Sequence, residues 1–145
     1  MTVSWKRATA DFEYATYNRD HTWSFDGGHH MPASSAPAYL GNPKLVDPEE
    51  AFVASLSSCH MLTFLAIASN RRFTVDEYLD DPVGLMEKNE AGRLAITRVT
   101  LAPRVTFSGE TKPTSDELAQ LHHDAHEQCF IANSVRADVR VRPEP

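Results

Sequence analysis

The sequence predicts an α+β domain with two helices and an antiparallel sheet. Segments with strand-like alternation precede, separate and follow two segments that each open with a helix-capping pattern. The resulting order, β-β-α-β-β-α-β, is typical of this class. The chain of 145 residues suits one compact domain spanning 1–145 and is short for two.

Two aromatic-rich segments predict an N-terminal hairpin. Residues 11–18, DFEYATYN, alternate aromatic and polar side chains, and residues 21–26, HTWSFD, alternate again. The intervening NRD predicts a turn that would hold Arg19 near a strand end. Residues 27–46 are rich in Gly, Pro and Ser, so we expect a long surface loop of the kind that often covers a pocket.

The first helix is predicted to begin after Asp47. Asp47 is a good N-cap, Pro48 suits the first helical position, and Glu50 completes a capping-box pattern with Asp47. The apolar stretch 52–67 contains Ser, Thr, Cys and His and is short for a bilayer span. We therefore expect a buried core helix and no membrane segment.

The second half of the chain predicts a meander, a helix and a closing strand. Residues 71–107 resemble two long strands joined by the turn NEAG, with Pro103 at a bulge or edge position. Thr114 and Glu117 form a second capping-box pattern, which predicts a helix through about Gln128. The terminal VRADVRVR alternates apolar and charged side chains, as a strand does.

The charge pattern excludes some classes of function. The net charge is −6 and no block of like charges occurs, so we expect no nucleic-acid binding through a basic surface. The N-terminal segment MTVSWKRATADFEY has no apolar signal core, so we expect no export and a cytoplasmic location.

The two cysteines, Cys59 and Cys129, are the candidates for chemistry. In a cytosolic chain two such residues can be buried fillers, metal ligands or redox partners. Cys59 stands in the middle of the first predicted helix, where a small buried hydrophobe is the simplest interpretation. A free thiol with a pKa of about 8.5 is only slightly ionised at neutral pH, so a reactive thiolate needs a nearby cation. His60, if protonated, is the one cation within a helical turn, and Arg19 is a candidate from elsewhere in the fold.

The histidines offer a metal site as an alternative. His122, His126 and Cys129 fall at i, i+4 and i+7 on one helical face, and Cys59 or His60 could complete a tetrahedral set. The segment has neither a CxxC nor an HExxH signature, and a His-rich helix face is more often solvated or hydrogen-bonded.

Glu49 and Glu50 complement the dipole of the first helix, and one of them could orient an arginine. Ten helical residues span roughly 15 Å, so a helical Glu49 cannot touch its own Cys59. If Glu49 is catalytic, it must act through an arginine side chain or on the thiol of a second subunit.

Several segments together resemble the OsmC and Ohr (organic hydroperoxide resistance) family. DPEEAFVASLSSCHMLTFLAIAS is similar to the family's helix, which has an Asn-Pro-Glu-rich opening, small and apolar residues, and a first cysteine. AHEQCFIANSV resembles the region of the family's second cysteine. ATYNRDHTWSFDGG resembles its first hairpin, where an arginine sits in the turn. The resemblance spans nearly the whole chain.

The resemblance implies an OsmC-like fold, with antiparallel sheets around a long central helix in an intertwined homodimer. It also implies a thiol-dependent peroxidase that reduces organic hydroperoxides and hydrogen peroxide without a cofactor, and that is regenerated by a small or protein dithiol. Carried over by position, Cys59 is the peroxidatic thiolate and Cys129 the resolving cysteine. Arg19 stabilises the thiolate, and Glu49 holds Arg19.

The sequence departs from the family pattern at three places. Asp47 replaces the common Asn, His60 follows the cysteine where an apolar or aromatic residue is frequent, and CFIANS replaces a Cys-Pro opening. Substrate preference and reductant are therefore open. A metal-binding protein and a non-catalytic ligand-binding protein on the same fold remain as alternatives.

Overall fold

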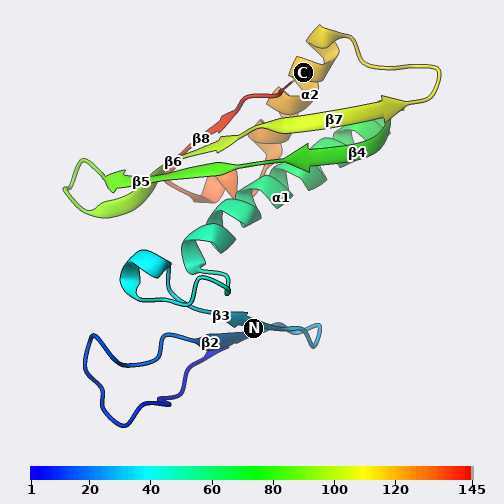
Figure 1. The fold of residues 1–145 in the computed structure, drawn as a ribbon. Coiled ribbons are helices and arrows are strands. Elements are labelled where there is room, and N and C mark those ends of the chain that lie inside the picture. Colours follow the sequence, from blue (N-terminus) through cyan, green and yellow to red (C-terminus); the bar gives the residue numbers. More distant parts are fainter. Residues whose placement is uncertain (145) are drawn as a thin grey trace. The chain divides into compact units, whose positions relative to one another are not determined.

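The computed structural model describes residues 1–144, which form parts of two compact units, Met1–Ala51 and Phe52–Pro145 (Figure 1). The first unit contains β1 (Thr2–Ser4), β2 (His21–Ser24), β3 (His30–Ala33), the 3₁₀ turn η1 (Pro37–Tyr39) and the start of α1 (Pro48–Asn70). The second contains the rest of α1, β4 (Thr74–Asp80), β5 (Val83–Lys88), β6 (Leu94–Leu101), β7 (Pro103–Ser108), α2 (Ser115–Gln128), the 3₁₀ turn η2 (Ala132–Ser134) and β8 (Asp138–Val141).

The first unit is built on a three-stranded antiparallel sheet with the order β1-β2-β3. Only β2 of the predicted hairpin exists, and the strand predicted for residues 11–18 is wrong. The surface loop predicted for residues 27–46 is also partly wrong, because it contains β3 and η1. A turn at Gly28, whose φ is +83°, brings β3 back beside β2.

The aromatic residues of segment 11–18 form a ring cluster instead of a strand. The Phe12 and Tyr17 rings lie 5.2 Å apart between centroids, and both pack near Trp5. The amides of Thr16 and Tyr17 donate to the Glu13 carbonyl in a turn. These two amides are therefore bonded within the loop and not to a neighbouring strand.

The helix α1 begins as predicted. The Glu50 amide donates to Asp47 Oδ1 at 2.8 Å, and the Asp47 amide donates to Glu50 Oε2 at 3.4 Å, which together form the capping box. Its buried side chains recur every four residues and are Leu56, His60, Phe64 and Ala68. By length and composition alone α1 could cross a membrane, but a core helix passes the same test, and this buried stripe is what a core helix has.

The sheets of the second unit are mostly antiparallel, with one exception. β4 pairs with β7 and β5 with β6, both antiparallel, around the predicted turn, in which the Gly92 amide donates to the Asn89 carbonyl. The two long strands of the prediction are each broken once, between β4 and β5 and between β6 and β7. β8 joins β6 in parallel, beside the antiparallel pairs that the sequence predicts.

Asp80 forms hydrogen bonds at the breaks between β4 and β5 and between β6 and β7. One carboxylate oxygen accepts from the Ala102 amide at 2.7 Å, and the other accepts from the Ser57 hydroxyl of α1. Pro103, which lacks an amide hydrogen, begins β7 directly after this break. The strand interruption therefore leaves no backbone donor of Ala102 unpaired.

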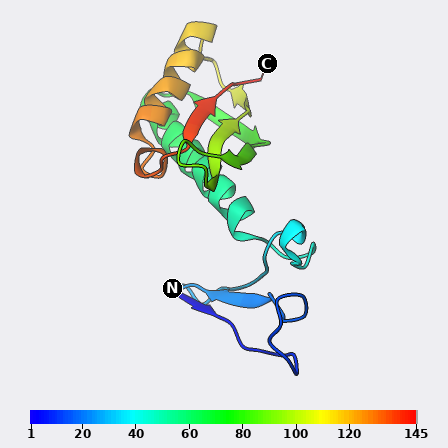
Figure 2. The same cartoon turned by 90° about the vertical axis from the view of Figure 1, so that its left-hand side faces the viewer.

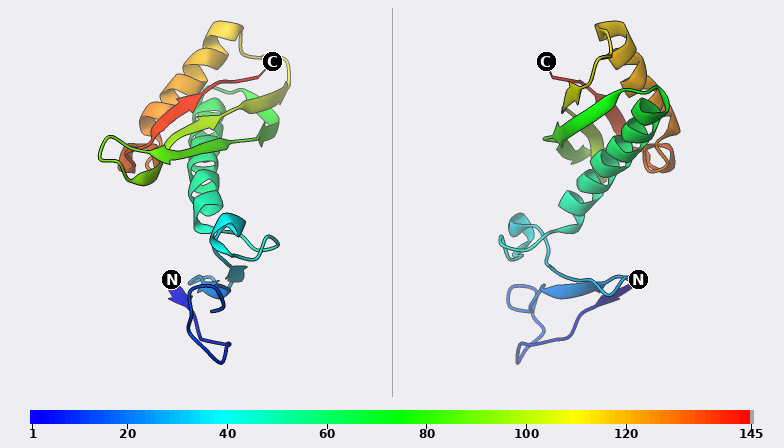
Figure 3. Two further views of the ribbon diagram at one scale, coloured as in Figure 1. Left: turned by 60° about the vertical axis from the view of Figure 1, so that its left-hand side comes forward. Right: turned by 90° about the vertical axis from the view of Figure 1, so that its right-hand side faces the viewer.

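The second helix also begins as predicted, with a capping box between Thr114 and Glu117. In the second unit α1 and α2 lie on the same side of the strands, as Figures 2 and 3 show. Phe64 and Ala68 of α1 share one core cluster with Leu121 and Ala125 of α2. This packing fixes the two helices that carry the cysteines.

Candidate active site

Cys59 lies in the middle of α1 and is half-buried. Its side chain lines a groove of about 890 Å³ in the second unit. The groove is mainly apolar, and Leu62, Phe130 and Ile131 form much of its wall, with Ser55, Ser58 and Thr63 along α1. Leu62 is 60% exposed and Phe130 is 83% exposed. A small molecule that enters this groove therefore meets the Cys59 thiol.

Cys129 follows the last residue of α2 and is buried, with 1% of its surface exposed. Burial raises the pKa of the Cys129 thiol, and the backbone amides of Ala132 and Ile131 partly offset this by donating hydrogen bonds to the sulfur. The distance from the Ala132 nitrogen to Cys129 Sγ is 3.4 Å. The sulfur is held in place by the turn that leads into η2.

The structure brings the two cysteines together, and both are free thiols. Their side chains share a hydrogen bond, and after burial this bond is the next cause that raises the pKa of Cys129. The negative charge of an ionised Cys59 raises it further. In this pair the groove exposes the Cys59 thiol, and the Cys129 thiol is buried beside it.

Arg19 lies in the first unit, in the loop before β2 and not in a hairpin turn. One guanidinium nitrogen donates to the Tyr17 carbonyl at 2.6 Å, and another donates to the Tyr14 carbonyl. The guanidinium carbon lies 4.0 Å from the centroid of the Tyr17 ring. Within residues 1–144 it forms no ion pair with a carboxylate, so its charge is available to a further group.

Glu49 and Glu50 differ in what they bond. Glu50 is committed to the capping box with Asp47. Glu49 is half-buried in the first turn of α1, and among the described residues its carboxylate has neither an ion pair nor a hydrogen bond, with Arg19 or any other residue. Arg19 and Glu49 belong to the first unit, and the two cysteines belong to the second.

The buried histidines are a feature that the sequence did not predict. His60 Nε2 lies 3.2 Å from His122 Nδ1, and the His122 ring stacks on Phe64 with 4.4 Å between centroids. Burial lowers the pKa of both histidines to about 4. The signal was present in the spacing, since His60 lies midway between Leu56 and Phe64 on the four-residue stripe.

The metal site considered from the sequence is not assembled. Over residues 1–144, no three or more His, Cys, Asp or Glu side chains are arranged so that they could hold a metal ion. His60 and His122 instead face each other in the core, and Cys129 lies beside Cys59 as a free thiol.

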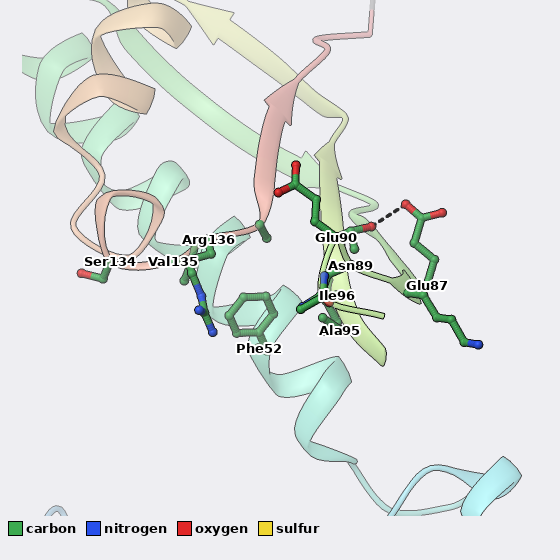
Figure 4. Close-up of a pocket in the computed structure, with 13 residues that line it drawn as sticks. Phe52, Glu87, Asn89, Glu90, Ala95, Ile96, Ser134, Val135 and Arg136 are labelled. Carbon is green, nitrogen blue, oxygen red and sulfur yellow. Dashed lines mark hydrogen bonds between the residues drawn. The ribbon is translucent and has the colours of Figure 1, made fainter. Parts of the chain in front are cut away.

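A second groove, of about 930 Å³, lies beside the β5–β6 turn (Figure 4). Phe52 of α1 and Arg136 of the segment before β8 line it together with Glu87 of β5 and Glu90 of the turn. No cysteine or histidine is among its described lining residues. It is therefore separate from the thiol pair.

Comparison with known proteins gives a family and a fold. Residues 41–144 match the family model described as OsmC-like protein. An OsmC-like protein of unknown function from Vibrio cholerae O1 biovar eltor is 49% identical in sequence, with a TM-score of 0.96 over 99% of this chain and 96% of that one. The search of curated proteins gives no match.

Two more distant structures share the fold. An organic hydroperoxide resistance protein from Elizabethkingia anophelis is 18% identical, with a TM-score of 0.68 over 99% of this chain and 94% of that chain. The organic hydroperoxide resistance protein OhrB of Bacillus subtilis is 19% identical, with a TM-score of 0.66 over 97% and 98% of the two chains.

Proposed function

The chain belongs to the OsmC-like protein family, and from this premise we propose that it is a thiol-dependent peroxidase that reduces organic hydroperoxides and hydrogen peroxide. The names of the hydroperoxide resistance proteins that share its fold support this reaction class. The single observation that carries the proposal is the thiol pair, in which one sulfur lines an open groove and the other is buried beside it.

In the first step the Cys59 thiolate attacks the terminal oxygen of the hydroperoxide. The O–O bond breaks, the sulfur is oxidised to a sulfenic acid, and the alkoxide leaves and takes up a proton as the alcohol. Hydrogen peroxide would give water in the same way. The apolar walls of the groove, Leu62, Phe130 and Ile131, favour an organic substituent over a hydrated small peroxide.

In the second step the Cys129 sulfur displaces the hydroxyl group of the sulfenic acid. The Cys129 proton and the hydroxyl leave as water, and a Cys59–Cys129 disulfide forms. A small or protein dithiol then reduces this disulfide by exchange and becomes a disulfide itself. The cycle needs no bound cofactor, because sulfur carries both electrons.

Arg19 is proposed to stabilise the Cys59 thiolate and the charge that develops on the leaving oxygen. Its guanidinium has no carboxylate partner in the described part of the chain, and the Glu49 carboxylate has none there either. The two side chains are therefore available to form an ion pair when a second copy completes the site. Because the helix rise separates Glu49 from its own Cys59, we propose that Arg19 and Glu49 act on the thiol of a second copy in a homodimer. The whole chain would work as one OsmC-like domain in the cytoplasm.

The experiment is a steady-state assay of peroxide consumption with a dithiol as reductant. Cumene hydroperoxide, hydrogen peroxide and a no-protein blank are compared under the same conditions. Turnover that saturates with cumene hydroperoxide and is slower with hydrogen peroxide is the expected result. Consumption no faster than the blank with either peroxide would leave a non-catalytic ligand-binding protein on this fold as the better account.

A further inference from the structure

We propose that the thiolate that reduces the oxidised protein attacks the sulfur of Cys59 and expels Cys129, so that the mixed disulfide forms on Cys59. This inference rests on the proposed Cys59–Cys129 disulfide and concerns which of its two sulfurs the reductant reaches. The unequal access to the two sulfurs carries it, and the donors around Cys129 lower the cost of expelling that sulfur.

Access favours attack at Cys59. Thiol–disulfide exchange needs the incoming sulfur to approach one sulfur atom on the side away from the other, and its rate depends on access to that atom. Cys59 lines the groove, whereas Cys129 is 1% exposed and does not line it. A thiolate in the groove therefore reaches the sulfur of Cys59 and not that of Cys129.

Burial makes the sulfur of Cys129 a poorer leaving group, and the amides of its turn offset part of that cost. The Ala132 amide donates to Cys129 Sγ at 3.4 Å. The turn is fixed independently, because the Asn133 amide donates to the Cys129 carbonyl and the Ser134 amide to the Ile131 carbonyl. Burial disfavours a thiolate at this position, and these fixed donors offset part of that cost at the moment the bond breaks.

The exchange balances as two successive displacements. The reductant thiolate forms a bond to Cys59 Sγ, the Cys59–Cys129 bond breaks, and Cys129 leaves as a thiolate that takes a proton from solvent. A second reductant thiol then attacks the reductant sulfur of the mixed disulfide and releases Cys59 as the thiolate. Two reductant thiols are oxidised to one disulfide, and the two cysteines are reduced.

The test maps the mixed disulfide on the intact protein. The protein is oxidised with one equivalent of cumene hydroperoxide, treated briefly with 2-mercaptoethanol, quenched in acid, alkylated with N-ethylmaleimide and digested with pepsin at low pH. Mass spectrometry then shows which cysteine carries each group. We expect 2-mercaptoethanol on Cys59 and N-ethylmaleimide on Cys129, in at least tenfold excess over the reverse pattern.

The matched control is the same disulfide unfolded in guanidinium chloride, where both sulfurs are open and the two patterns should be nearly equal. Equal labelling in the folded protein, or 2-mercaptoethanol mainly on Cys129, would overturn the inference. An equal bias in the unfolded control would also overturn it, since the fold would then not be the cause.

The design separates this inference from the proposed peroxidase activity. If peroxide yields no disulfide, diamide is used to form it, and the mapping proceeds as before. That outcome would count against the peroxidase while still deciding the site of attack. If diamide also fails to join the two cysteines, both proposals are wrong.

Discussion

The imidazole of His60 lies 3.2 Å from that of His122, between Nε2 and Nδ1, and the ring planes differ by only 5°. This contact ties α1 to α2, the two helices that position the cysteines. Neither ring has room for full hydration, and His60 Nδ1 and His122 Nε2 are buried without a partner among the described residues. Protonating either ring would put an unsolvated charge in the core.

The histidine pair predicts a loss of stability in mild acid. The pKa of each is about 4 when folded and 6.5 when exposed, so the unfolded chain binds more protons between these values. The contribution is complete above about pH 6.5 and is lost as the pH falls toward 4. The loss is on the order of 3 kcal/mol for one histidine, at about 1.4 kcal/mol per pKa unit.

Urea unfolding measured at a series of pH values checks this prediction. His122→Phe keeps an aromatic ring on Phe64 and removes one titrating group, so its free energy of unfolding should depend less steeply on pH. A wild-type protein with constant stability across this range would show that the pair does not control it.

Replacing the groove thiol should abolish turnover. Cys59→Ser keeps the size of the side chain but removes the nucleophile, so peroxide consumption should fall to the blank rate. Far-UV circular dichroism checks that the fold is kept. If Cys59→Ser keeps wild-type turnover, the mechanism is wrong.

Replacing the buried thiol should have a different effect. Cys129→Ala retains the nucleophile, so it should consume about one equivalent of peroxide and then stall at the sulfenic acid or oxidise further. Mass spectrometry of Cys59 distinguishes these states. Sustained turnover in Cys129→Ala with a dithiol would mean that the reductant attacks the sulfenic acid directly, without the resolving step.

Arg19 should control the reactivity of Cys59. Arg19→Met removes the cation and should reduce kcat/KM on the order of a hundredfold, which is typical of a lost charge-stabilising donor. Bromobimane alkylation of Cys59 across pH should shift to more alkaline pH. An unchanged alkylation profile would remove Arg19 from the site.

Glu49 and Glu50 form a matched pair for the same question. Glu49→Gln should reduce kcat/KM in the direction of the Arg19 variant, because a neutral amide holds the guanidinium less firmly. Glu50→Gln retains a capping-box side chain, so it should leave activity unchanged. If Glu50→Gln loses activity and Glu49→Gln does not, then Glu50 and not Glu49 positions Arg19.

The features that were predicted correctly from the sequence depend on residues close together in the chain. Both helix starts depend on side chains three residues apart, Asp47 with Glu50 and Thr114 with Glu117, and both were confirmed. The fold class and the family were also confirmed, since the cysteine helix is a long and distinctive segment. The proximity of Cys59 and Cys129 was open from sequence and follows from the packing of α1 on α2.

What the sequence did not predict depends on distant contacts. The pairing of β1 with β2 and of β8 with β6 joins segments that carry no turn signal between them. The aromatic alternation of residues 11–18 matched a strand, but the rings pack against each other and against Trp5 in a loop. The roles of Arg19 and Glu49, the homodimer and the single domain stay predictions.

The most direct measurement is a stopped-flow titration of the reduced protein with an organic hydroperoxide, with free thiols counted before and after. We expect rapid loss of two thiols per chain at one equivalent of peroxide, with both lost to the Cys59–Cys129 disulfide. No loss of thiols over minutes would contradict it, and the OsmC-like family would then describe the fold of this protein and not its chemistry.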